Sequence, residues 1–440
     1  MAWFGAAALA VAGLGLVHLF FPLGWDQSLY MTGAKAMADG STLYVDFWNN
    51  KQPGVFLFYW TAGRLFGFTE AGLHAFELVW MAPLCLALAA GVRPWLRHPW
   101  LAALAPVAVV GTYYATINEG TMTQPEVLVA LPTWLAVWLV ARDHGSPRRM
   151  AAAFLASGAC AAVTVTFKLI LAPLFVVLWL VVTVDLLARR KVPWARVMRD
   201  AWLPAAAGVV AVLAAVTAGF WLAGALEPML WASFVWPLEA LEAIRTAARS
   251  RLLRAAAWLV AGFAPWLLFA AVGIVTRSRL ALLMVAWIAA AVALILVQSL
   301  SWWDYHMLLL FPPIGVLAVL GIDRSVGFIG DRAGGPGAVV PLVATVLALT
   351  LASTQLTPFL TKARPLIGAT LVDHQGTAAY QRVVSDRYKA ARGVVGLLMT
   401  TDDLPGSVFV YGDPLIQFML DRKPAPAASG MVNDWWPKPT

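Results

Sequence analysis

Long apolar stretches separated by short polar connections dominate the chain. A membrane-spanning helix needs about 20 consecutive, mostly apolar residues. Eleven stretches approach this length, at residues 3–23, 71–92, 100–117, 126–142, 150–167, 169–187, 201–222, 255–275, 280–299, 304–321 and 338–356. The pattern predicts an all-α polytopic membrane protein with about eleven transmembrane helices.

Composition supports a lipid environment. Of the 440 residues, 61% are hydrophobic and 12% are charged, whereas soluble domains have roughly 45–50% and 25%. The net charge of +8 comes from basic residues in short clusters between apolar stretches, a pattern of membrane orientation rather than of nucleic-acid binding. We therefore expect a lipid bilayer and no nucleic acid as a partner. Cys85 and Cys160 both lie in apolar stretches, so neither a disulfide framework nor a metal site is expected.

Basic residues in the connections give an orientation. No positive segment precedes residues 3–23, and no good cleavage site follows them, so we interpret this stretch as a retained first helix. With the N-terminus inside, the inner connections hold fourteen Lys and Arg residues and the outer ones hold eight. Because inner loops are enriched in basic residues, the N-terminus is predicted to be cytoplasmic and the C-terminus extracytoplasmic.

Three outer segments are too long or too polar to be simple turns. Residues 24–70 hold several charges, and residues 223–254 mix tryptophans with arginines as in a helix lying on the bilayer. The third is the tail, 357–440, with a helical pattern at 376–399 and a strand-like run at 407–411. We therefore expect a transmembrane domain at 1–356 with outer juxtamembrane helices, followed by a small α/β extracytoplasmic segment at 357–440.

Two polar clusters follow the first apolar stretch. Asp26 stands where that helix ends, so its carboxylate could accept a proton from an incoming hydroxyl, or it could cap the next helix. Residues 43–54 include Tyr44, Asp46, Asn50 and Lys51. Such a set could bind an anionic, sugar-like headgroup, with the compact ammonium of Lys51 against a phosphate. The alternative is a lysine that snorkels to the interface beside a proline turn.

Two further clusters lie on the same predicted side. Glu119 and Glu126 are the only charges of their outer loop, and either is a candidate acid or sugar ligand; Glu126 could instead be a favourable charge at a helix start. Asp304 and His306 stand at the outer end of a helix pair, where the histidine could also be structural. Lys168, alone between two apolar stretches, could face the same cavity.

These residues resemble a known pattern. The sequence is similar to the GT-C superfamily of membrane glycosyltransferases, especially the bacterial enzymes similar to protein O-mannosyltransferases and to the lipid A aminoarabinose transferase. The shared positions are Asp26, Tyr30, Gly40, Tyr44, Asp46, Lys51-Gln52-Pro53, Trp303-Asp304-Tyr305-His306, and, in the tail, 408–413 with 421–424.

The resemblance implies an inverting transfer of a hexosyl or pentosyl group from a polyprenyl-phosphate donor to a hydroxyl of a lipid, glycan or protein. It makes Asp26 the base, Lys51, Tyr30 and His306 the donor-phosphate ligands, and Glu119 or Glu126 the second acid. Tyr44, Asp46, Asn50 and Asp304 are expected to bind substrate. The expected location is the outer face of a bacterial plasma membrane.

The sequence departs from the pattern at Asn50, where relatives often have a carboxylate that can help to hold a metal. A required metal is therefore not implied, and a divalent metal remains open. A transporter or flippase of a lipid-linked intermediate is the main alternative, and a noncatalytic scaffold is another. A transporter predicts polar residues through the membrane midplane, and the sequence has few.

Overall fold

The computed structural model describes residues 2–243, 249–298, 302–332, 337, 339–400 and 406–422. Its α-helices are α1 Ala2–Leu16, α2 Trp25–Ala38, α3 Pro53–Phe66, α4 Glu70–Val92, α5 Leu104–Pro106, α6 Thr112–Thr116, α7 Pro125–Leu128, α8 Ala130–Ala141, α9 Pro147–Phe167, α10 Ala172–Val184, α11 Trp194–Val197, α12 Leu203–Leu222, α13 Leu226–Leu230, α14 Trp236–Ala243, α15 Arg249–Ile274, α16 Arg279–Val297, α17 Phe311–Arg332, α18 Val339–Leu351, α19 Thr357–Ile367, α20 Thr377–Val384, α21 Asp386–Met399 and α22 Pro414–Leu420. Short 3₁₀ and π segments extend many of them: η1 Arg93–Trp95, η2 Pro99–Ala103, η3 Val107–Gly111, η4 Leu169–Leu171, η5 Asp185–Arg189, η6 Met198–Trp202, η7 Trp231–Val235, η8 Asp304–Leu310, η10 Ala352–Leu356 and η11 Gly368–Val372.

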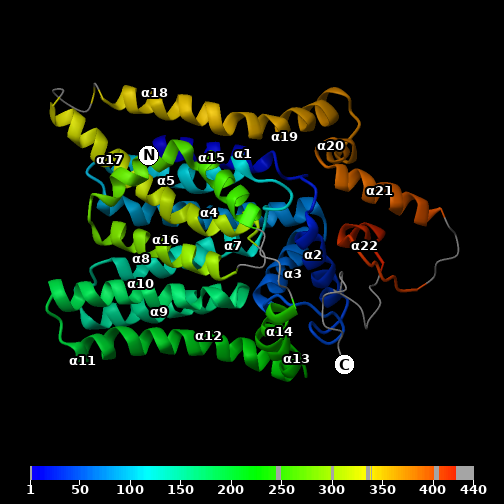
Figure 1. Cartoon of the computed structure of the whole chain (residues 1–440), viewed down its shortest axis with the longest axis horizontal. Coiled ribbons are helices and arrows are strands. Elements are labelled where there is room, and N and C mark those ends of the chain that lie inside the picture. The colour runs from blue at the N-terminus through cyan, green and yellow to red at the C-terminus, as the bar shows by residue number, and fades with distance from the viewer. Residues whose placement is uncertain are drawn as a thin grey trace.

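The long apolar helices lie side by side as a bundle, and their axes run roughly across the view of Figure 1. The run Asp304–Arg332, which contains α17, is almost entirely buried and forms the centre, whereas Trp194–Leu222, with α12, leaves most of its surface exposed. α12 packs closely on α9, because a Cβ atom at Gly158 would lie 2.0 Å from the backbone oxygen of Ala205. Such small-residue contacts are typical of helix packing in membranes.

Helices long and apolar enough to cross a membrane number six among the described residues. They are Glu70–Trp95, Pro147–Phe167, Leu169–Arg189, Trp194–Leu222, Arg279–Val297 and Asp304–Arg332, and Arg249–Ala264 with Trp266–Ile274 would be a seventh as one broken span. The predicted count of eleven is therefore not confirmed. The stretch 3–23 forms only the 15-residue α1, Pro125–Ala141 is short, and 99–116 changes between 3₁₀, α and π turns. Position 338 of the last stretch lies outside the described residues.

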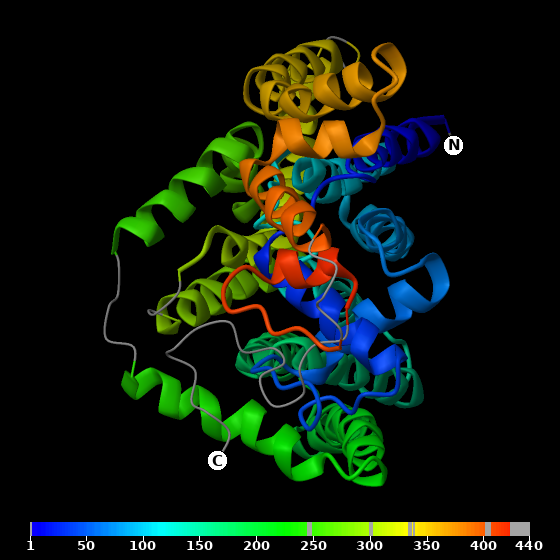
Figure 2. The ribbon, with the colours of Figure 1, turned by 90° about the vertical axis from the view of Figure 1, so that its right-hand side faces the viewer.

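The expected juxtamembrane elements gather at one end of the bundle, which we call the α2 end (α2, α3, α13, α14 and α20–α22). This end lies on the right of Figure 1 and faces the viewer in Figure 2, where the orange and red tail helices lie in front of the bundle. The segment α13–α14 packs against the loop before α3 through Trp48, whose ring lies 5.9 Å from Trp231 and 5.7 Å from Trp236. The interfacial helix predicted at 223–254 is consistent with this packing, although Arg245 lies outside the described residues.

The tail is helical where it is described. The helix expected at 376–399 is present as α20 and α21, which Ser385 separates. The strand expected at 407–411 is not: in the described part of the tail this segment is extended only around a single bridge residue, Val408. A β-branched run needs a partner strand to become a sheet, and its described neighbours α21 and α22 are helices. The predicted α/β character of the tail is thus not confirmed. Lys423 and Pro424 lie outside the described residues.

Candidate functional site

Asp26 lies in the first turn of α2 and is half-buried. The N-cap is Gly24, with no side-chain cap, so the capping interpretation of Asp26 is wrong. A Cβ atom at Gly24 would lie 1.9 Å from the backbone oxygen of Glu119. Only glycine therefore allows the 118–126 loop to contact the start of α2, and this contact places Asp26 beside that loop.

Lys51 comes from a tight loop before α3. The Tyr44 hydroxyl donates to the Lys51 carbonyl (2.6 Å), and the Lys51 amide donates to Asn49 Oδ1 (3.0 Å). Asp46 closes the preceding turn by accepting from the Thr42 amide (2.7 Å). The Lys51 side chain is half-buried and forms no ion pair with a carboxylate among the described residues. The loop therefore presents a fixed positive charge that an external anion can reach.

Glu126, Lys168 and His306 meet at the α2 end although they are far apart in sequence. Lys168 Nζ donates to Glu126 Oε1, and His306 Nε2 lies 3.6 Å from the same oxygen. The Glu126 and His306 side chains are only 1% and 3% exposed. Burial of ionisable groups in such a set is costly unless they are paired, and Lys168 provides the pairing cation for Glu126.

Lys51 reaches this cluster because α3 packs against the end of α9. A Cβ atom at Gly54 would lie 2.7 Å from the Thr166 carbonyl oxygen, two residues before Lys168. Burial lowers the pKa of Lys168, and the neighbouring charge of Lys51 lowers it further, while Glu126 and Asp26 raise it. Both lysines and both carboxylates therefore share one electrostatic environment, in which nearby like charges destabilise each ammonium.

Tyr30 forms the inner wall of the cluster. Its ring is fully buried and contacts Phe56 (5.8 Å) and Tyr59 (5.4 Å) edge to face. Burial, with a further contribution from Asp26, raises the pKa of Tyr30 well above its usual range, so the phenol stays protonated and can donate.

Three buried polar atoms of the cluster have no hydrogen-bond partner within the described part of the chain: Tyr30 Oη, Glu126 Oε2 and His306 Nδ1. Buried polar atoms in proteins are almost always paired, and exceptions need an explanation such as a ligand or water. Their gathering beside Lys51 makes this cluster the candidate site.

The other predicted residues lie around the cluster. Glu119 accepts from Ser385 Oγ in the tail (2.6 Å) and is half-buried. Asp304 begins η8 and interacts electrostatically with Arg254. Asn50 is half-buried next to Lys51, Tyr44 is buried against Phe220 (5.6 Å), and Asp46 is exposed. Tyr44 and Asp46 thus shape the loop, and their expected contacts with substrate remain predictions.

The tail closes over the start of α2. Arg387 of α21 forms a two-pronged ion pair with Asp413 (2.6 and 2.5 Å) and donates to the Leu23 carbonyl (3.1 Å). Lys35 of α2 pairs with Asp421 after α22. These contacts fix the tail helices beside Asp26 and Glu119. No group of three His, Cys, Asp or Glu side chains that could hold a metal ion occurs in the described ranges.

Solved structures show which fold this is. ArnT from Cupriavidus metallidurans in the apo state is similar at 18% identity and a TM-score of 0.59, over 95% of this chain and 84% of that one. The same protein bound to undecaprenyl phosphate is similar at 16% identity and 0.55, over 96% and 84%. The archaeal oligosaccharyltransferase AglB from Archaeoglobus fulgidus, in complex with an inhibitory peptide and a dolichol-phosphate, is similar at 13% identity and 0.51, over 96% and 64%.

The chain has the GT-C fold. The resemblance drawn from the sequence is thereby confirmed at the level of the fold. No family model and no curated protein matches the sequence. Nearly the whole chain takes part in the GT-C match, so the tail helices beside Asp26 belong to the matched region as well.

A second buried polar network of this GT-C chain has no counterpart in the sequence predictions. Glu77 of α4 is fully buried, accepts from the Tyr113 hydroxyl through Oε1, and accepts from Thr123 Oγ1 through Oε2 (2.7 Å). The Tyr113 oxygen also accepts from the Thr123 amide (2.9 Å). The available signal was an acidic residue inside an apolar stretch, 71–92, which is costly in lipid and usually has a role.

Proposed function

We propose that this chain is a membrane glycosyltransferase that moves a sugar from a polyprenyl-phosphate donor to an acceptor hydroxyl, with inversion at the anomeric carbon. The observation that supports it most is the convergence of Asp26, Lys51, Glu126, Lys168 and His306 at one end of a GT-C bundle. These residues come from separate segments of the chain. Glu126 Oε2, His306 Nδ1 and the neighbouring Tyr30 Oη are buried without a hydrogen-bond partner among the described residues.

The nature of the donor is inferred from the neighbours and from charge. ArnT was solved bound to undecaprenyl phosphate, and AglB with a dolichol-phosphate. By analogy, we infer that Lys51 binds the donor phosphate, with the Tyr30 hydroxyl and His306 as hydrogen-bonding partners. A polyprenyl chain cannot leave the bilayer, so the donor would enter sideways between helices while its headgroup stays at the aqueous interface.

The proposed reaction is a single displacement. Asp26 accepts the proton of the acceptor hydroxyl while that oxygen bonds to the anomeric carbon from the face opposite the phosphate. The bond between the anomeric carbon and the phosphate oxygen breaks, and its electron pair leaves with the polyprenyl phosphate. Lys51 stabilises the extra negative charge as it forms, in the manner of a preorganised electrostatic site. Glu126 holds Lys168 and His306 in position around the phosphate.

We also propose the membrane face, the domain division and the class of acceptor. The basic connections support a site on the outer face of the membrane, with a cytoplasmic N-terminus and an extracytoplasmic C-terminus, and we take this membrane to be a bacterial plasma membrane. The domain division at residue 356 is part of the proposal. The acceptor is a hydroxyl of a lipid, glycan or protein that approaches Asp26.

The test is transfer of label from radiolabelled polyprenyl-phosphate sugars by purified protein in membranes. Asp26→Asn should slow transfer by about 10²–10⁴ if this residue is the base, and Lys51→Ala should abolish it while the protein inserts normally. Asp39→Asn, directly after the same helix, and Lys389→Ala, in the tail, are exposed matched controls that should keep activity. Wild-type protein that carries labelled donor across vesicles without transferring it would instead establish the flippase alternative.

A further inference from the structure

A cavity lies at the other end of the bundle from the candidate site. It has a volume of about 450 Å³ and lies between α10 with η5 on one side and α16 on the other. The helical run that contains α10 and η5 begins just after Lys168 of the candidate site and ends at Arg189 of the cavity. At about 1.5 Å per residue, the 21 residues of this run, Leu169–Arg189, span about 30 Å. We call this the Arg279 end; it lies at the opposite ends of the long helices from Asp26.

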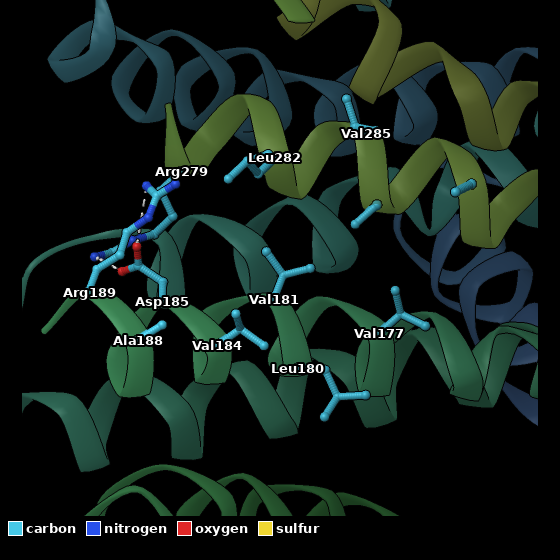
Figure 3. Close-up of a pocket in the computed structure, with 12 residues that line it drawn as sticks. Val177, Leu180, Val181, Val184, Asp185, Ala188, Arg189, Arg279, Leu282 and Val285 are labelled. Carbon is cyan, nitrogen blue, oxygen red and sulfur yellow. Dashed lines mark ion pairs between the residues drawn. The ribbon is translucent and has the colours of Figure 1, made fainter. Parts of the chain in front are cut away.

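The cavity has a charged mouth and an aliphatic body. Figure 3 shows Arg279, Asp185 and Arg189 at one end, with Val177, Val181, Val184 and Leu282 extending away from them. Apart from Asp185, Arg189 and Arg279, every residue that lines the cavity is Val, Leu or Ala. Both walls belong to helices long and apolar enough to span a membrane, so the aliphatic body lies at the depth of lipid chains.

The charges at the mouth are only partly neutralised. Arg279 is 8% exposed and saturated by Asp185 (2.5 Å), Asp143 (3.3 Å) and the Ala141 carbonyl (3.2 Å). Arg189, in contrast, is 61% exposed and touches Asp185 only at 3.7 Å. Arg279 therefore joins the chain segments around the mouth of the cavity, and Arg189 remains available to bind an anion.

The surroundings add further positive charge. The chain segments at this mouth, 142–143, 185–191 and 277–279, carry six basic side chains against two acidic ones. Of these, Arg142, Lys191 and Arg277 are exposed; Arg190 is exposed too, but it pairs with Asp143 and with Asp185 (3.4 Å). Such an excess attracts an anionic membrane surface, and each basic residue near it contributes to binding.

We propose that this cavity binds an anionic glycerophospholipid of the leaflet opposite the candidate site. Its phosphate lies against Arg189, and an acyl chain lies along Val181 and Val184 of α10 and Leu282 of α16. The aliphatic lining excludes a purely polar ligand, and the excess of basic over acidic side chains at the mouth favours an anionic headgroup over a zwitterionic one. The lipid holds the Arg279 ends of α10 and α16 together.

Native mass spectrometry of the purified full-length protein, with phosphatidylglycerol or phosphatidylcholine added, tests this site. One phosphatidylglycerol molecule should be retained by the wild type. Leu282→Trp should abolish that retention by filling the cavity, and Arg189→Gln should weaken it about fivefold, the factor expected for one basic residue near an anionic headgroup. Ala286→Leu fills less space and replaces Leu282→Trp if that variant does not fold.

Matched controls separate this site from lipid bound anywhere on the bundle. Leu203→Trp, on the exposed face of α12, and Arg148→Gln, in an exposed connection, should retain phosphatidylglycerol like the wild type. Equal retention of phosphatidylglycerol and phosphatidylcholine would overturn the proposal. So would equal losses in the cavity variants and the controls.

Discussion

Glu77 and Glu126 are both buried carboxylates near the α2 end, but their surroundings differ. Both oxygens of Glu77 accept hydrogen bonds, from Tyr113 and Thr123. His74 Nδ1 lies 3.6 Å from Glu77, but no lysine or arginine pairs with this carboxylate within the described residues. Glu126 has one oxygen occupied by Lys168 and the other without a partner in that same part of the structure. A saturated network is typical of a structural support, whereas an unsatisfied buried atom indicates a place for a ligand.

The two carboxylates are also connected. Thr123, which Glu77 holds, lies three residues before Glu126 and has a φ of 51°, which is unfavourable for a β-branched residue. Its carbonyl accepts from the Tyr59 hydroxyl (3.0 Å). The Glu77 network thus stabilises a strained loop, and that loop presents Glu126 to Lys168. One carboxylate builds the site and the other belongs to it.

The largest expected effect comes from breaking the pair at Glu126. Lys168→Ala leaves a buried carboxylate without its cation, which should lower the free energy of unfolding by about 3–5 kcal/mol. Thermal unfolding in detergent measures it. The double variant Lys168→Met with Glu126→Gln removes both charges and should recover most of that loss. If the double variant is as unstable as Lys168→Ala, the pairing is not what stabilises this region.

Exchanging each carboxylate for an amide sharpens the contrast. Glu126→Gln should slow sugar transfer by about 10²-fold, and because it leaves Lys168 without its carboxylate it should also lower the free energy of unfolding, as Lys168→Ala does. Glu77→Gln cannot accept at both oxygens as before, so it should cost about 1–3 kcal/mol of stability while folded molecules keep most of their turnover. Each of the two variants is measured for its rate of sugar transfer and for its thermal unfolding. A loss of turnover per folded molecule in Glu77→Gln as large as that in Glu126→Gln would remove the distinction between support and site.

The sequence predicts the Glu126 cluster but not the Glu77 network. Asp26, Glu126 and His306 stand at or near the end of an apolar stretch, Lys51 lies in the outer segment 24–70, and the basic connections put all four on one side. The pairing of Lys168 with Glu126 depends on how α9 approaches α7, which no local pattern encodes. The Glu77 network depends on Tyr113 and Thr123 from other segments, so only the acidic residue itself could have been noticed.

The fold is predictable to a similar degree. Apolar length identifies the long helices, such as α16 and the run containing α17, because lipid requires them. It cannot tell whether a shorter apolar stretch crosses the membrane or packs as a partial helix, as α1 does. The run 407–411 has strand-forming residues, but a strand needs a partner, and α22 follows it instead.

A third buried charge tests whether pairing matters. Lys362 donates to the Ile117 carbonyl and forms no ion pair with a carboxylate in the described ranges, and burial lowers its pKa to about 8. Between pH 8 and 10 the unfolded chain binds the proton that the folded chain has lost, so stability should rise with pH, by about 2 kcal/mol. Lys362→Met should remove this rise, as unfolding measured across that range will show. A rise of the same size in the variant would assign it to other groups.

The smallest effect concerns Glu119, the other carboxylate predicted for the site. Ser385 Oγ donates to Glu119 Oε2 (2.6 Å) and also accepts from the Tyr388 amide as the N-cap of α21. Ser385→Ala should destabilise α21 by about 1 kcal/mol, seen as faster hydrogen exchange over 386–399, with transfer changed less than threefold. Ser385→Asp keeps the cap but repels Glu119, so it isolates the contact between the tail and the loop. If Ser385→Asp slowed transfer as much as Glu126→Gln, the contact between Glu119 and the tail would belong to the site itself.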